Sequence, residues 1–175
     1  MIKANSGVPL MKKHLYVALF TLIASTGFSS AFADDTFPSY LTDKYCNGIK
    51  VDFMTGSMKS LQRYRDKQLP SQHRGGMNNI RKYLEQREDW LLECDNYLAK
   101  TSKNRLFKDQ KTTDNIFSAI SSVTSELNSL ITGVTYSTEP GQSATSVASQ
   151  KFDHLFKLVD DHQTLMLMKG QVVYR

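Results

Sequence analysis

Apolar residues between positions 77 and 98 recur at alternating steps of three and four. They are Met77, Ile80, Leu84, Leu91, Cys94 and Leu98, with Arg87 at the one charged step. This spacing puts them on one side of an α-helix over about 77–100 and is typical of helices that pack together. Tyr83, Trp90 and Tyr97 follow at intervals of seven beside the stripe. They predict a wider packing surface, and a ligand surface is the alternative interpretation.

Three further segments show the same helical spacing, over about 51–68, 113–133 and 148–169. Pro70 ends the first, Thr112 or Thr113 is expected to cap the third, and Gly170 is expected to close the last. Strand patterns are nearly absent. The sequence therefore predicts an all-α, antiparallel four-helix bundle-like domain. The stretch 34–48 contains Pro38, Asn47 and Gly48 and predicts an irregular N-terminal arm.

The chain has 175 residues, of which 40% are hydrophobic and 22% are charged. This composition excludes a collagen-like chain and argues against wholesale disorder, because enough apolar surface is present to form a core. The length fits one domain.

The first thirty-three residues have the three parts of a secretory signal in order. Lys12 and Lys13 are followed by the apolar run 15–24, and Ala31-Phe32-Ala33 matches a cleavage site. We predict a signal peptide over 1–33, with Met11 as an alternative start, and a single helical domain over 34–175. A membrane-spanning helix needs about 20 apolar residues, which is more than the run 15–24 supplies. A permanent membrane anchor is therefore the alternative to a cleaved signal. The short basic start predicts the periplasm of a Gram-negative bacterium, or secretion.

The two cysteines, Cys46 and Cys94, are expected to pair, because an exported chain folds in an oxidising compartment. The bridge would pin the arm across the second helix. The bridge would lower the entropy of the unfolded chain, which predicts a stabilisation of the fold by about 4 kcal/mol. Two buried free thiols are the alternative to a disulfide. The C-x-x-C spacing of redox enzymes is absent.

Motifs of catalysis are also absent, including G-x-S-x-G, H-E-x-x-H, the Walker loop and C-x-x-C-H. We therefore expect neither an enzyme nor a cofactor, although an enzyme with an unrecognised site stays an alternative. His162 interrupts an apolar stripe and is expected to be a hydrogen-bonded core residue.

A metal-binding alternative combines His162 with Met54 or Met58 from the first helix. In helix order and in these two residue types, the pattern resembles the b-type cytochrome bundles of the periplasm, which implies a bound haem iron. His162, Met166 and Met168 offer the imidazole and thioether donors that suit Cu(I).

Basic residues are concentrated between positions 50 and 87, where nine basic and three acidic residues give a net charge of +6. The segment 34–175 has 19 basic and 17 acidic residues, so we expect no nucleic-acid binding. The basic segment predicts attraction to a protein or an acidic envelope component, including peripheral membrane contact, and a solvated surface is the alternative. Arg63, Arg74, Arg81 and Lys82 are the predicted partner-binding residues.

The sequence as a whole predicts a non-catalytic protein that binds another macromolecule. An envelope accessory factor, a chaperone-like binder and an immunity protein all fit this description. The sequence decides neither the partner nor the oligomeric state.

Overall fold

The computed structural model describes residues 37–133 and 143–168, with the side chains of residues 144 and 165–168 excepted. The predicted signal peptide, its cleavage after Ala33 and the alternative start at Met11 lie outside these residues. So does Gly170, the predicted end of the last helix.

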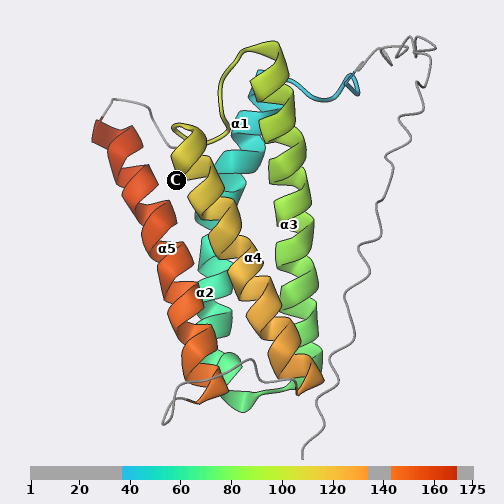
Figure 1. The fold of residues 1–175 in the computed structure, drawn as a ribbon, viewed down its shortest axis with the longest axis vertical. Coiled ribbons are helices and arrows are strands. Elements are labelled where there is room, and N and C mark those ends of the chain that lie inside the picture. Colours follow the sequence, from blue (N-terminus) through green and yellow to red (C-terminus); the bar gives the residue numbers. More distant parts are fainter. Residues whose placement is uncertain (1–36, 134–142, 169–175) are drawn as a thin grey trace, which may run out of the picture. The chain divides into compact units, whose positions relative to one another are not determined.

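Within the described residues the chain is helical and has no strand (Figure 1). The first helical segment comprises α1 (Asp43–Asp52), the π-helical turn η1 (Phe53–Ser57) and α2 (Met58–Lys67), which follow one another without a break. A short 3-10 turn, η2 (Leu69–Ser71), leads to α3 (Arg74–Thr101), which is followed by α4 (Gln110–Thr132) and α5 (Ala144–Met168). Successive helical segments run in opposite directions (Figure 1). The prediction of an all-α, antiparallel bundle of four helical segments is confirmed.

The apolar stripes of the four segments meet in one core. Its fully buried large side chains include Phe53, Leu61, Leu84, Leu91, Ile116, Leu127, Phe152 and Leu155. The first and last segments are neighbours, as an antiparallel order requires, since the Gln163 side-chain Nε2 donates a hydrogen bond to the Met54 carbonyl at 2.6 Å. No helix of the described ranges is both long enough and apolar enough to cross a membrane.

The first helix begins earlier than predicted. The Thr42 hydroxyl accepts a hydrogen bond from the Tyr45 backbone N–H at 3.1 Å, so the helix is capped there and includes Asn47 and Gly48. Capping supplies a partner for a backbone donor that would otherwise be unpaired.

The disulfide between Cys46 and Cys94 is present, with 5.3 Å between the two Cα atoms. Because Cys46 lies in α1, the bridge joins two helices, α1 and α3. The prediction that it pins an irregular arm across the second helix is therefore wrong.

Two other helix starts also differ from the prediction. The His73 side chain caps α3 by accepting a hydrogen bond from the Gly76 N–H at 3.1 Å, so the helix begins before Met77. Asp109 caps α4 by accepting from the Thr112 N–H at 2.8 Å, and Thr113 is buried. The prediction that Thr112 or Thr113 caps this helix is therefore wrong, because the cap is Asp109, about one turn earlier. Gly133 ends α4 with a φ of 73°, a left-handed conformation that suits glycine.

The connection between α3 and α4 is fixed by a buried carboxylate. Asp95, only 3% exposed, accepts hydrogen bonds from the Leu106 backbone N–H at 2.8 Å and from Arg105 Nε at 2.9 Å. Arg105 is also its ion-pair partner, and this interaction raises the pKa of the guanidinium. A buried charge is tolerated here because it is paired and hydrogen-bonded.

Candidate functional site

Three of the basic side chains in the segment 50–87 are paired within the chain. Arg65 forms ion pairs with Asp66 and with Asp153 of α5. Arg81 pairs with Glu85 one helical turn away and donates a hydrogen bond to the Asn78 side chain at 3.0 Å.

Arg87 is the third paired side chain, and it is held between two aromatic rings. Its guanidinium carbon lies 4.7 Å from the ring centre of Tyr83 and 4.4 Å from that of Trp90. Arg87 Nε donates to the buried Ser57 hydroxyl at 3.3 Å and lies 3.7 Å from an Asp52 carboxylate oxygen. The aromatic residues of α3 thus fix an arginine against the first helical segment, as expected for a packing surface.

Five of the six other basic side chains form the surface that we call the cationic face, whereas the sixth, Lys50, is half-buried. The cationic face comprises Lys59, Arg63 and Lys67 of α2 with Arg74 and Lys82 of α3, all of which are exposed. None of the five forms an ion pair with another described residue. The three members on α2 are spaced by four, which puts them on one side of the helix.

The packing of α3 against the first helical segment brings the α2 residues and the α3 residues of the cationic face to one side of the molecule. The Tyr83 hydroxyl donates to the Ser57 hydroxyl at 3.0 Å, which fixes the antiparallel register of α3 against the first segment. In this register Lys82 lies level with the start of α2, and Arg74 lies beside the turn that follows Lys67.

The structure treats the four predicted partner-binding residues differently. Arg63, Arg74 and Lys82 are exposed members of the cationic face, whereas Arg81 is half-buried and engaged by Glu85 and Asn78. Lys59 and Lys67 were not singled out from the sequence. Their four-residue spacing from Arg63 is the signal that could have identified them.

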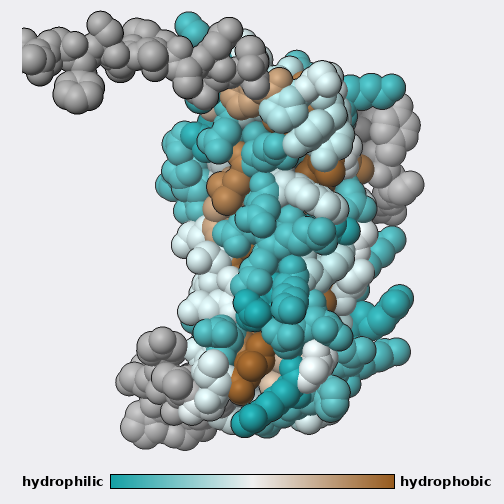
Figure 2. Space-filling view, turned by 90° about the vertical axis from the view of Figure 1, so that its right-hand side faces the viewer, coloured by the Kyte–Doolittle hydropathy of each residue, from teal (hydrophilic) through white to brown (hydrophobic). Residues whose placement is uncertain are grey.

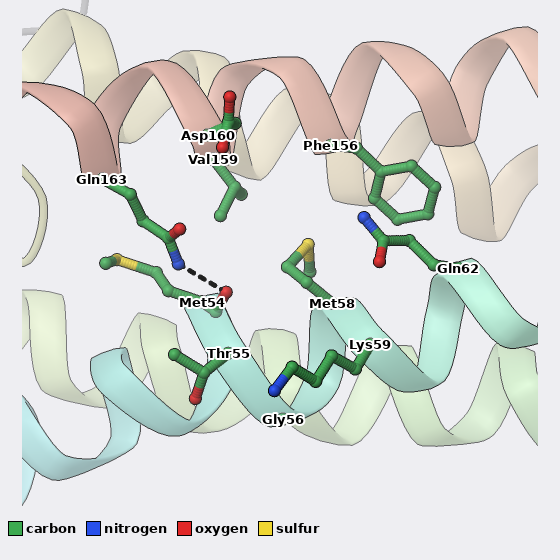
Figure 3. A pocket seen from close by; sticks show the side chains of 10 residues that line it. All are labelled: Met54, Thr55, Gly56, Met58, Lys59, Gln62, Phe156, Val159, Asp160 and Gln163. Atoms are coloured by element: carbon green, nitrogen blue, oxygen red, sulfur yellow. Dashed lines mark hydrogen bonds between the residues drawn. The ribbon is translucent and has the colours of Figure 1, made fainter. Parts of the chain in front are cut away.

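A groove between the first helical segment and α5 has a volume of about 460 Å³ and is drawn in Figure 3. Met54, Met58 and Phe156 give it an apolar floor, and Lys59 and Asp160 are among its polar rim residues. The hydrogen bond from Gln163 to the Met54 carbonyl crosses it (Figure 3). The π-helical turn η1 forms one wall, and such turns are frequent at functional sites.

A second groove, the α2–α3 groove, has a volume of about 400 Å³. One wall is formed by Ser60, Arg63 and Tyr64 of α2 and by Gln68, which follows α2. The other wall is formed by Gly76, Asn79, Ile80 and Tyr83 of α3. Burial raises the pKa of Tyr64 to about 12, so its phenol stays protonated. The buried Tyr64 hydroxyl has no hydrogen-bond partner in the described part of the chain.

His162 lies in the core, where it is 4% exposed and meets the Phe107 ring edge to face at 5.4 Å between ring centres. Burial, and secondarily the charge of Lys50, lowers its pKa to about 4. Neither ring nitrogen has a hydrogen-bond partner among the described residues. The position in the core agrees with the prediction, but the expected hydrogen bonding is wrong.

The residues of the metal-binding alternative are not gathered in one pocket. Met58 lines the groove of Figure 3, whereas His162 lines a separate pocket of about 190 Å³ with Lys108, Thr112 and Asn115. The Met166 side chain lies outside the described atoms. Within the described ranges, no group of three or more His, Cys, Asp or Glu side chains could hold a metal ion.

Large hydrophobic side chains contribute little to the described surface. Only Tyr40 and Leu92 are classed as exposed among them, at 52% and 41%. Hydrophilic residues dominate the side of the bundle on which α3 lies, and hydrophobic residues show only in small patches there (Figure 2). The side shown in Figure 2 therefore offers mainly hydrophilic side chains to a partner.

The chain matches no protein-family model, and neither a curated protein nor a solved structure is significantly similar to it. Its function therefore has to be inferred from its own residues.

Proposed function

We propose that the chain is an exported, non-catalytic binding protein whose cationic face docks an acidic macromolecule of the cell envelope. The observation that carries this proposal is the row of Lys59, Arg63 and Lys67, which are exposed at four-residue spacing and have no ion-pair partner in the described residues. Nearby arginines of the same segment are paired with acidic side chains. The unpaired row therefore keeps its charge available for an external partner.

Two observations support export to the periplasm or the cell exterior. Residues 1–33 have the basic start, the apolar run and the small-residue site of a secretory signal. The described structure contains a disulfide between its only two cysteines, and such bonds persist in oxidising compartments.

The nature of the surface favours recognition through charge. Hydrophobic docking requires a contiguous apolar patch, and exposed large hydrophobics in the described residues are limited to two separate side chains. Complementary charge raises the rate of encounter and selects partners of opposite sign. An acidic partner is therefore the one that the described surface fits.

A crosslinking pull-down from intact cell envelopes tests the proposal. The test variant carries Lys59→Glu, Arg63→Glu and Lys67→Glu. The matched control carries Lys44→Glu, Lys103→Glu and Lys111→Glu, which reverse the same number of exposed charges elsewhere on the bundle.

We expect the wild type and the control to capture the same partner, and we expect the test variant to lose it. Equal capture by all three proteins would contradict the proposal. Circular dichroism spectra and melting curves verify that each variant is folded.

A further inference from the structure

We propose that the α2–α3 groove binds an extended acidic peptide segment of the partner. This inference rests on the proposed function, because Arg63 of the cationic face lines the groove. It adds the position of the contact and the chemistry of the part that is recognised.

The charge of the groove selects an anionic occupant. Arg63 lines it, is exposed, and has no ion-pair partner among the described residues. Gly76 lies in the first turn of the 28-residue helix α3, where the aligned peptide dipoles give a positive potential. A guanidinium binds a carboxylate through two parallel hydrogen bonds, so an Asp or Glu side chain fits this position.

The walls of the groove suit a peptide. Ile80 and the ring of Tyr83 offer apolar contact, and the Tyr83 ring is held in place by its hydrogen bond to Ser57. The side-chain amides of Gln68 and Asn79 have no hydrogen-bond partner within the described part of the chain. An amide supplies both a donor and an acceptor, which a peptide backbone can use.

The floor contains an unused donor. Tyr64 lines the groove and is 4% exposed, and its buried hydroxyl lacks an acceptor among the described residues. Buried polar groups are hydrogen-bonded in most proteins, so an unpaired one marks a place where an acceptor is missing. Solvent does not reach this hydroxyl in the structure, so a carboxylate contacts it only if the two helices separate.

The shape of the groove favours a peptide over a lipid surface. A volume of about 400 Å³ between two helices is concave and accommodates a few side chains. Binding to a bilayer relies instead on an open basic surface with apolar side chains that insert. Neither Tyr40 nor Leu92, the exposed large hydrophobics of the described residues, lines this groove.

The test measures fluorescence anisotropy with the disulfide-bonded protein and a short labelled peptide of Glu, Leu and Gly. The same peptide with Lys in place of Glu, and vesicles of phosphatidylglycerol, are the comparison ligands. Asn79→Trp fills the groove without a change in charge, and Asn96→Trp is the matched control at an exposed position of the same helix. Arg63→Gln removes the proposed carboxylate partner, and the pair Lys59→Gln and Lys67→Gln lowers the charge outside the groove.

We expect saturable binding of the Glu peptide, no binding of the Lys peptide, and no binding of the vesicles. Asn79→Trp and Arg63→Gln each weaken binding by about tenfold or more, whereas Asn96→Trp leaves it unchanged. Melting curves verify the fold of each variant.

Unchanged affinity in Asn79→Trp would overturn the groove as the site. If the lysine pair alone then weakened binding, the proposed function would stand without the groove. Absence of binding to the Glu peptide would overturn the proposal outright, and binding to the vesicles alone would assign the cationic face to lipid.

Discussion

His162 is 4% exposed, and its two ring nitrogens have no hydrogen-bond partner in the described residues. Burial disfavours the charged imidazolium, and the positive charges of Lys50 and Lys108 add to this effect, while Asp109 opposes it. The folded protein thus keeps this histidine neutral down to a pH of about 4.

This histidine makes stability depend on pH. The unfolded chain binds a proton at His162 below a pH of about 6.5, and the folded protein does so only near its lowered pKa of about 4. The contribution of His162 to the free energy of unfolding should therefore fall as the pH decreases from about 6.5 to about 4 and level off below that range.

His162→Leu should reduce this fall, and it should also raise stability at pH 7 by about 1 kcal/mol because a buried unpaired polar group is removed. Urea denaturation of both proteins across this pH range provides the comparison, since the carboxylates titrate equally in each. An identical pH dependence in the variant would show that His162 does not carry the effect.

Asp95 illustrates the opposite case, a buried charge with its partners in place. Asp95→Ala removes the acceptor for the Leu106 N–H and leaves Arg105 without its ion pair. We expect a loss of about 3 kcal/mol in the free energy of unfolding. Asp153→Ala, which breaks an ion pair at a side chain that is 55% exposed, should cost less than about 1 kcal/mol. Equal losses in denaturant titrations would contradict the structural role of Asp95.

At the scale of the elements, the three-and-four spacing of apolar residues predicts all four helical segments. It does so because each segment buries one continuous side in the common core. The starts of the helices were missed because they depend on single capping bonds, such as Thr42 to the Tyr45 N–H. Asn47 and Gly48 have low helix propensity, and the bond at Thr42 and the disulfide at Cys46 compensate for it.

The π-helical turn η1 could not be predicted from periodicity. An extra residue in one turn shifts the spacing without leaving a distinct composition. Ser57, the last residue of this turn, accepts hydrogen bonds from the side chains of Tyr83 and Arg87.

The disulfide connects two elements that already pack together. The bond restricts the unfolded chain, so its removal should lower the free energy of unfolding by about 4 kcal/mol. Replacement of both Cys46 and Cys94 by Ala avoids a free thiol, and urea denaturation gives the difference from the wild type. Addition of reductant to the wild type should reproduce the loss. Identical unfolding curves with and without reductant would contradict a bond that stabilises the fold.

At the scale of the whole molecule, the excess of basic residues between positions 50 and 87 is evident from the sequence. The division into paired and unpaired cations is not, because Arg65 finds Asp153 on a helix far away in the chain. Of the nine basic side chains in this segment, the structure leaves five in the cationic face. Arg81 is not among them, because it is half-buried and paired with Glu85. The α2–α3 groove escapes sequence reasoning for the same reason, since its two walls meet only after folding.

Charge-driven docking also predicts a dependence on salt. Screening shortens the range of exposed charges to about 8 Å at physiological ionic strength and to about 3 Å at 1 M. We expect capture of the envelope partner to decrease steadily with added salt. Capture that is unchanged at 1 M salt would indicate a hydrophobic contact instead.

In the proposed function, the cationic face contacts the partner inside the envelope of living cells. A photoreactive amino acid at position 67 tests it directly, with position 111 on α4 as the exposed control. We expect one discrete crosslinked product from position 67 and no product of the same size from position 111. Identical products from both positions, or none from position 67, would contradict the proposed contact.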